Sequence, residues 1–474
     1  MQGPFPWGKP ALPREEDGTL YPWTGCDLDS FEQAIGDPLE WTENAQLPFV
    51  TLQHPPLDDG EAIIRPNSSD SLHHQNKGRP DGDGRDGRPG GGDRPYGAPF
   101  EATSYFTMPS TTLDNLYLLT RGSHAQGKIK YIEAEYTDTP TVSVKMYYWH
   151  RDMRSSVNIC MLTHNDTSQG VGIFTPDKRW DWMPIGQRRA VFDILVTLPV
   201  GNSKRISQLE ADVPNFNQLF YHVDSPLDVV RISATQGDIT VEGQLRAKII
   251  DIATSNGEIY GQFWTDESIR LETTNAGISA NILMINEHTG PTSAFLKTSS
   301  GTIVIRWLLS SSANRGSPSW PGHGGNFVID STTSNALVYH TFEDTPLDPN
   351  VIFDTRTSKN SASVTMWRTV EGPFEMHGDI GVPLVETHLR AVDDPMQLGR
   401  DPILKILGFS EDMLEGYFHW RQASPAGDGN SNEGRNVEER TNIDNVLSPS
   451  AGVTKTKSRI RIFAENGKPM LNFV

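Results

Sequence analysis

Apolar and polar residues alternate along much of the chain beyond residue 100, with the period of two that is typical of half-buried β-strands. The alternation is clearest over Thr141–Trp149, where Val142, Val144, Met146 and Tyr148 share one face. Four more strands are predicted on the same grounds: Asn115–Thr120, Lys128–Ala134, Val157–Thr163 and Ala190–Leu198. Clusters of Gly, Pro, Asn and Asp separate these segments, so the pattern predicts an all-β body.

A sequence repeat begins at Val229, where VVRISATQGDITVEG is followed by IIDIATSNGEIYGQF, IRLETTNAGISANIL and AFLKTSSGTIVIRW. In each unit, one run of alternating apolar and polar residues precedes a polar corner and a second run follows it. Gly and Asn suit the corner because they tolerate the positive φ that a tight bend requires. Six corner residues are spaced by 20, 19, 25, 35 and 24 positions: Gln236, Asn256, Asn275, Ser300, Asn335 and Lys359. Such periods are typical of repeat folds whose units bury their inner faces by stacking.

Apolar residues occupy two equivalent positions in all six units. Six residues before the corner stand Val230, Ile250, Ile269, Ala294, Ile329 and Phe353, and three residues after it stand Ile239, Ile259, Ile278, Ile303, Val338 and Ala362. The next inner positions are regular in the first four units and weaken in the last two, where Ser331, Thr355 and His340 appear. We therefore predict a parallel β-solenoid, similar to a single-stranded β-helix, with an irregular N-terminal segment and a small C-terminal cap.

The predicted β-rich domain covers residues 103–390, with its clearest repeats at 229–368. Residues 1–102 are rich in Pro and Gly and are expected to be irregular, ending in a low-complexity linker at 78–97. The dense Gly and Pro content, 42 and 33 residues, also excludes helix bundles and coiled coils.

Residues 391–474 are expected to hold the C-terminal cap. Helical spacing of Ile403, Leu404, Leu407 and Leu414 predicts one short helix over Asp401–Gly416. A polar linker at 423–458 is expected to be disordered, and a terminal strand at Arg459–Ala464 is expected to return to the body.

The overall charge restricts the class of partner. Lys and Arg number 41 and Asp and Glu number 60, so the net charge of −19 disfavours nucleic acid, which is bound through phosphate neutralisation. Cys26 and Cys160 are too few for a disulfide framework and lack the spacing of a zinc site, although one bridge stays open. The sequence predicts neither a signal peptide nor a membrane span.

Two patterns that resemble catalytic or metal sites lack the partners that the chemistry needs. Gly322-His323-Gly324 is similar to an element of polygalacturonases, but those hydrolases need paired carboxylates ahead of it, whereas Asp393-Asp394 comes after it. Asp81, Asp83 and Asp86 do not have the spacing of a calcium loop. We therefore predict no catalytic residue, no cofactor and no metal ligand.

Exposed aromatic side chains are the remaining candidates for ligand contacts, because sugar rings stack on aromatic rings. Trp180, Trp182 and Trp320 lie in segments with the composition of loops. These three tryptophans are the predicted contacts of a ligand that the sequence does not name.

The runs TQGDI, TSNGEI, TTNAGI and TSSGTI resemble the putative-adhesin β-solenoid family of unknown function. The segments Val370–Phe374 (VEGPF), Asp394-Pro395 followed by Arg400, and Gly416–Trp420 (GYFHW) are similar to the fungal branch of that family. The resemblance covers roughly residues 103–474 and implies a non-catalytic, adhesin-like role at a membrane or cell surface. Fungal members often have a membrane-spanning segment ahead of the solenoid, which this sequence lacks.

Three hypotheses for the function stay open at this stage. The first is a non-enzymatic adhesin-like or scaffold protein with a protein or glycan ligand on a surface. The second is a glycan-active parallel β-helix enzyme, of the polygalacturonase or lyase kind, and the third is a carbohydrate-binding module without catalysis. The sequence names neither the partner nor the oligomeric state.

Overall fold

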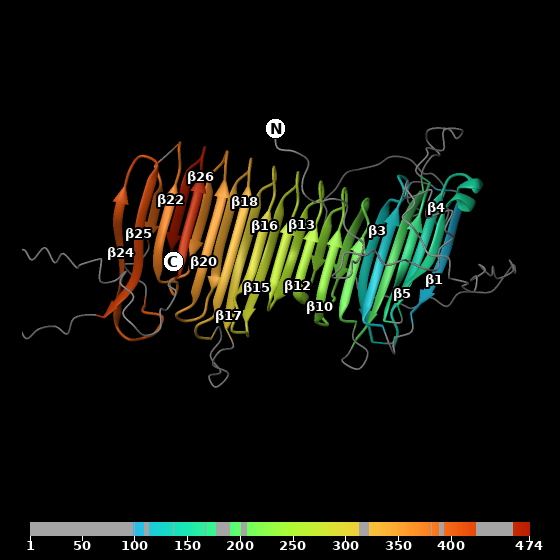
Figure 1. The fold of residues 1–474 in the computed structure, drawn as a ribbon, viewed down its shortest axis with the longest axis horizontal. Helices are drawn as coiled ribbons and strands as arrows, with labels where there is room; N and C mark the ends of the chain where they lie inside the picture. Colours follow the sequence, from blue (N-terminus) through green and yellow to red (C-terminus); the bar gives the residue numbers. More distant parts are fainter. Residues whose placement is uncertain are drawn as a thin grey trace, which may run out of the picture.

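The structure is a computed structural model, and it describes residues 98, 100–108, 113–135, 137–165, 167–176, 190–200, 206–311, 322–380, 382–387, 393–422 and 458–474. The described part is all β, as the sequence predicts: 27 strands and one short 3₁₀ helix, Arg151–Ser156 (η2). The strands belong to one large sheet and lie side by side along the long axis of the molecule (Figure 1). No described helix is long and apolar enough to cross a membrane.

Within this sheet, the strands form two series of hydrogen-bonded neighbours, which we call the first and the second ladder. In order along the stack, the first ladder contains β5 (Asn158–Asn165), β6 (Ser168–Phe174), β2 (Asn115–Arg121), β8 (Gln208–Asp212), β10 (Leu227–Ser233), β12 (Leu245–Ala253), β14 (Ser268–Glu272), β16 (Thr292–Lys297), β18 (Asn326–Thr333), β20 (Asn350–Thr357), β26 (Arg459–Ala464), β22 (Gly372–His377), β25 (Met413–Gln422) and β24 (Arg400–Phe409).

The second ladder contains β1 (Phe100–Thr107), β4 (Thr141–Tyr148), β7 (Ala190–Pro199), β3 (Gly127–Ala134), β9 (Phe216–Tyr221), β11 (Ile239–Glu242), β13 (Ile259–Thr265), β15 (Ile278–Asn286), β17 (Ile303–Ser311), β19 (Val338–Asp344), β21 (Ala362–Met366), β27 (Pro469–Phe473) and β23 (Leu384–Thr387). Pairing is parallel from β6 to β22 in the first ladder and from β7 to β23 in the second. The five strands predicted between Asn115 and Leu198 all form, with shifts of one or two residues at their ends.

The core lies between the two ladders. Val230, Ile250, Ile269, Ala294, Ile329 and Phe353, the predicted row six residues before the corner, are consecutive register partners in the first ladder and are buried. The residues of the predicted row from Ile239 to Ala362 are likewise consecutive register partners in the second ladder, and they are buried. Rings from both ladders meet between them, as in the edge contact of Phe342 with Phe353 at 5.5 Å. The repeat alignment therefore predicted the register of the stack correctly.

A threonine ladder holds the polar corners together. Two residues before the last five corner residues, a buried threonine hydroxyl donates a hydrogen bond of 2.9–3.3 Å to a backbone carbonyl of the preceding unit: Thr254 to Gly237, Thr273 to Gly257, Thr298 to Ala276, Thr333 to Gly301 and Thr357 to Ala336. A buried hydroxyl without a partner costs about 1–3 kcal/mol, so the threonine pattern favours this one stacking register. Asn275 also donates to Asn256 at 2.7 Å, which explains the corner asparagines structurally.

The predicted helix over Asp401–Gly416 is wrong, because this segment forms the antiparallel hairpin β24–β25. The inward face of β25 carries Leu414, Phe418 and Trp420 with the period of a strand. In β24 the alternation is broken by a bulge between Ile406 and Gly408, and the shift of one position places its apolar residues at spacings that resemble a helix.

The hairpin closes one end of the first ladder, at the left of Figure 1. An open strand edge invites pairing with other chains. β24 carries Pro402, the exposed Lys405 and the bulge, three features that discourage such pairing. At the other end, β1, β4 and β7 pair antiparallel in the second ladder and β5 with β6 in the first. Residues 1–97, most of the segment that the sequence predicts to be irregular, lie outside the described residues.

The last strands of the chain insert into the interior of the stack. β26, the predicted strand Arg459–Ala464, lies between β20 and β22, and β27 lies between β21 and β23. Sequence analysis missed β27 because a five-residue strand that begins with Pro469 gives little signal. The final unit therefore joins parts of the stack that precede it in sequence.

Removing residues 458–474 is expected to destabilise the protein severely, because β20 and β21 would lose their neighbours on one side and the core would open. Ile462→Ala, which truncates one fully buried side chain of β26, should cost about 2–5 kcal/mol. Chemical denaturation and light scattering would measure both. A truncated chain that stays monomeric and unfolds at the wild-type midpoint would contradict the insertion.

Candidate functional site

The three predicted ligand contacts, Trp180, Trp182 and Trp320, lie outside the described residues, and so does Cys26. Gly322-His323-Gly324 is described, and its backbone has a local role. His323 forms a bridge with Leu347, whose N–H donates to the Gly322 carbonyl at 3.0 Å. Gly322 and Gly324 have φ values of 95° and 74°, which glycine adopts most readily. The glycines of this motif are thus explained by chain geometry.

The outward face of the second ladder carries a row of exposed residues in register. We call Tyr260, Ser279, Val304 and Tyr339 the tyrosine row, because they are consecutive partners on β13, β15, β17 and β19. Tyr260 is 57% exposed, Val304 41% and Tyr339 43%. Large apolar side chains in a single line on a strand face are unusual, since the outward positions of a half-buried strand are generally polar.

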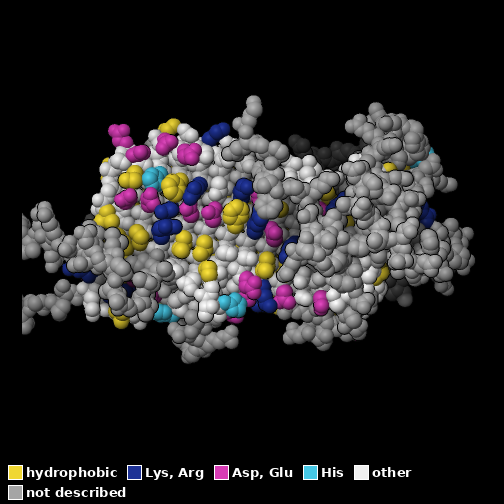
Figure 2. All heavy atoms as spheres, in the orientation of Figure 1, with side chains coloured by type: hydrophobic (Ala, Val, Ile, Leu, Met, Phe, Trp, Pro, Cys, Tyr) yellow, Lys and Arg dark blue, Asp and Glu magenta, His cyan; other side chains and the backbone are white. Residues whose placement is uncertain are grey.

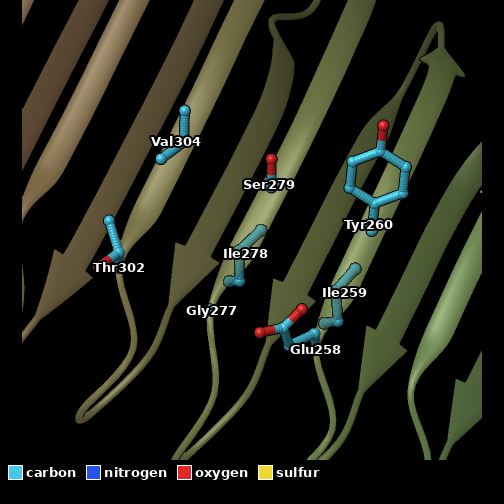
Figure 3. Close-up of a pocket in the computed structure, with 8 residues that line it drawn as sticks. All are labelled: Glu258, Ile259, Tyr260, Gly277, Ile278, Ser279, Thr302 and Val304. Atoms are coloured by element: carbon cyan, nitrogen blue, oxygen red, sulfur yellow. The ribbon is translucent and has the colours of Figure 1, made fainter. Parts of the chain in front are cut away.

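Ser279 makes a gap in this row. A hollow of about 190 Å³ lies there, lined by Glu258, Ile259, Tyr260, Gly277, Ile278, Ser279, Thr302 and Val304. Figure 3 shows the side chains of Tyr260, Ser279 and Val304 on three neighbouring strands, with the small serine between the ring and the valine. The hollow therefore results from one short side chain between two larger ones.

Uncharged polar side chains flank the tyrosine row two residues further along the strands. Gln262, Asn281 and Thr341 are exposed there, and the fourth member of this row is Arg306. The Arg306 guanidinium forms an ion pair with Glu343 at 3.5 Å. The two rows together present rings, amides and hydroxyls with little net charge.

Sequence analysis missed the tyrosine row, although the repeats contain a signal for it. Each member stands four residues after its corner residue, as Tyr260 follows Asn256 and Tyr339 follows Asn335. The apolar inner positions dominate the repeat pattern, and the outward positions vary between Tyr, Ser and Val, so the row is not a sequence motif.

Charged side chains cover much of the outward face of the first ladder. Neighbouring strands bring opposite charges together, as in Arg231–Glu210 at 2.7 Å, Lys297–Glu272 at 3.1 Å and Arg461–Glu375 at 3.1 Å. Figure 2 shows one face of the molecule on which acidic and basic side chains are interspersed along the long axis. Exposed pairs of this kind contribute little stability each.

Two aspartates interrupt this alternation. Asp330 on β18 and Asp354 on β20 are register partners, so their backbones lie one strand spacing apart, roughly 4.8 Å. Partial burial and then the negative charge of Asp354 raise the pKa of Asp330. Asp354 accepts two hydrogen bonds from Arg356, at 3.0 and 3.1 Å. The two carboxylates thus differ in their hydrogen-bond donors: Asp354 accepts from an arginine, whereas Asp330 accepts from the Thr332 hydroxyl at 3.3 Å.

A third cluster brings together the three segments that carry the fungal resemblance. Asp394 is almost fully buried and accepts bonds from the Arg400 side chain, at 2.8 and 3.2 Å, and from the backbone N–H groups of Met396, Leu398 and Arg400. These bonds, those from Arg400 first, hold the pKa of Asp394 well below its usual range. Glu371 accepts from Arg400 and from the Trp420 backbone N–H. The three segments therefore have a structural role, because their hydrogen bonds hold the terminal hairpin against the rest of the stack.

The one fully buried histidine of the described residues lies in the core. His340 accepts a hydrogen bond at Nδ1 from the indole of Trp307 at 3.0 Å, and burial lowers its pKa to about 3. The ring is neutral at physiological pH and replaces an apolar residue of the repeat. In the described part of the chain, no group of three or more His, Cys, Asp or Glu side chains is placed to hold a metal ion.

Comparison with known proteins gives likenesses to solved structures alone: no protein-family model and no curated protein matches the chain. A putative adhesin from Parabacteroides merdae is 14% identical, covers 55% of this chain and 96% of its own, and has a TM-score of 0.28. A putative cell adhesion protein from Clostridium sporogenes is 9% identical over 79% of this chain and 100% of its own, with a TM-score of 0.21. A putative adhesin from Bacteroides fragilis is 8% identical over 80% and 98%, with a TM-score of 0.26. Scores this low leave the function to be argued from the residues themselves.

Arg400→Met is expected to lower the free energy of unfolding by about 1–3 kcal/mol, because Asp394 would lose its charged partner in a buried site while keeping its backbone donors. Since the pKa of Asp394 is depressed in the folded state, its stabilisation is present above about pH 4 and is lost as the pH falls toward the folded pKa. The variant should therefore show a weaker loss of stability in acid. Arg356→Met, an exposed matched control, should cost less than about 1 kcal/mol; equal losses in denaturation would contradict this account.

Asp330→Asn is expected to raise stability at pH 7 by up to about 1 kcal/mol, after allowance for solvent screening. A carboxyl whose folded pKa is raised binds protons more readily when folded, so the wild type loses stability as the pH rises from about 4 through the folded pKa. The asparagine should remove this loss. Asp354→Asn, which also breaks the bonds from Arg356, should bring no gain. A lower melting temperature for Asp330→Asn at pH 7 would show that the charged carboxylate is needed.

Proposed function

We propose that the chain is a non-catalytic, adhesin-like or scaffold protein whose two ladders are the sides of one parallel β-solenoid. In this proposal each unit contributes one strand to each ladder, and the protein belongs with the fungal branch of the putative-adhesin family. It would act at a cell or membrane surface. The outward face of the second ladder would be its recognition surface.

The tyrosine row is the observation that carries this proposal. Within four consecutive strands of the ladder, two exposed rings and a valine offer apolar contact area that solvent-facing strand positions rarely have, with Ser279 between Tyr260 and Val304. Pockets for small ligands usually measure about 300–1,000 Å³, and the hollow at Ser279 is smaller, at about 190 Å³. A long face with one shallow hollow suits an extended partner better than an enclosed substrate.

The pair Asp330 and Asp354 favours a second candidate, a glycan-active β-helix enzyme. Retaining glycosidases hold two carboxyl groups about 5–5.5 Å apart, and the register places these two aspartates next to each other on adjacent strands. Against it, the two hydrogen bonds from Arg356 occupy Asp354. Reducing-end release from plant and fungal polysaccharides that is abolished in both Asp330→Asn and Asp354→Asn would establish this candidate.

Binding of the wild-type protein to an array that carries both glycans and surface proteins is the test of the proposed function. We expect at least one ligand to be retained and its signal to fall at least tenfold in Tyr260→Asp/Tyr339→Asp. A matched control is Tyr105→Asp, which alters an exposed tyrosine of the same ladder on β1, far from the row. An array without bound ligands, or binding that the double variant leaves unchanged, would refute the recognition surface.

A further inference from the structure

We infer that the tyrosine row binds a neutral glycan chain that lies along the long axis of the stack. The inference rests on the proposed function, because it names the ligand class for the same face. Its starting point is the chemistry of that face. Tyr260 and Tyr339 offer aromatic rings, and Gln262, Asn281 and Thr341 offer hydrogen-bonding groups beside them.

The rings match the apolar faces of sugar rings. A pyranose presents C–H groups on its faces and hydroxyls around its edge, and aromatic side chains pack against such faces while exposing a polar tip of their own. Tyr260 and Tyr339 are separated by three strand spacings, roughly 14 Å, which gives room for several linked sugars between them. A single monosaccharide could not contact both.

The flanking row matches the sugar hydroxyls. An amide both donates and accepts hydrogen bonds, and a hydroxyl does the same, so Gln262, Asn281 and Thr341 can satisfy hydroxyl groups in either role. They lie two residues from the tyrosine row on β13, β15 and β19, and their side chains are exposed on the same face. A ligand that stacks on the tyrosines would lie beside these groups.

Charge selects a neutral glycan over an acidic or a basic one. The protein carries a net charge of −19, which disfavours uronic acids and sulfated sugars at long range. The two rows contain one charged residue, Arg306, and Glu343 pairs with it. The face therefore lacks the array of unpaired basic groups that an acidic glycan would need.

The hollow at Ser279 supplies a position for one sugar. Ser279 is the shortest side chain of the row, and the rings and methyl groups of Tyr260 and Val304 form the walls on either side (Figure 3). A sugar ring seated there would contact Tyr260 at its edge and the serine hydroxyl below. Filling the gap should block binding without disturbing the strand.

The experiment is isothermal titration calorimetry of the full chain with cellohexaose, laminarihexaose, chitohexaose and mannohexaose, and with hexagalacturonate as the acidic counterpart. We expect at least one neutral hexasaccharide to bind with a Kd of about 1 mM or tighter. Tyr260→Ala and Tyr339→Ala should each weaken binding at least fivefold. Ser279→Val, which favours β structure and fills the hollow, should weaken it at least tenfold with an unchanged melting temperature.

Tyr105→Ala is the matched control, because Tyr105 is 76% exposed on β1, far from the row along the ladder, and its loss should leave the Kd unchanged. The inference is overturned if no neutral hexasaccharide binds at 1 mM, if hexagalacturonate binds equally well, or if Ser279→Val binds like the wild type. If the array retains surface proteins but no glycans, and the double aspartate variant loses that signal, the glycan inference is refuted. The proposed recognition surface is supported by the same result.

Discussion

Parallel strands that stack in register convert each position of the repeat into a row along the molecule. From β10 to β20 and from β11 to β21, the partner of a repeat position is the same position of the next unit, with one interruption between Trp307 and Leu308. A slip by one residue would turn every inner side chain outward. The buried threonine ladder adds a polar reason for the same register, because each hydroxyl finds its carbonyl only when the units are in phase.

The same constraint acts on the outer faces. On the first ladder it brings charges of opposite sign to neighbouring strands, and at Asp330 and Asp354 it brings like charges together. On the second ladder it aligns Tyr260 with Ser279, Val304 and Tyr339. A recognition surface can thus arise from residues that are far apart in sequence without any loop to carry it. Such a face is long and shallow, which suits a chain-like partner.

Much of the central stack could be predicted because the same pattern of apolar positions recurs in six units. The inner rows at Val230 and Ile239 follow from alignment, and every added unit confirms them. The ends could not be predicted in the same way. The bulge after Ile406 shifts the apolar residues of β24 to spacings that resemble a helix, so this strand was predicted as helical. The insertion of β27 depends on tertiary pairing with β21 and β23, which leaves no local pattern in the sequence.

The candidate site was less accessible to sequence reasoning. The residues of the tyrosine row stand at a fixed distance from the corner residues in the sequence. Only the structure shows that their side chains are exposed, and without that fact the row does not stand out as a candidate site. The contact of Asp394 with Arg400 and of Arg400 with Glu371 joins segments of the family resemblance that only the folded hairpin brings together. Residues that resemble a motif can in this way stabilise the fold, while the proposed recognition surface carries no motif.

Hydroxyl-radical footprinting with and without a bound neutral hexasaccharide tests the central claim, that in-register stacking builds one binding row. It reports the solvent exposure of individual side chains by mass spectrometry. The account predicts that Tyr260 and Tyr339 are protected together, while two aromatic residues away from the row keep their reactivity. These are Tyr105 on β1 and the half-buried Phe295 on β16, which alternates with the inward Ala294 and Leu296. Protection of Phe295, or of one tyrosine of the row without the other, would contradict it.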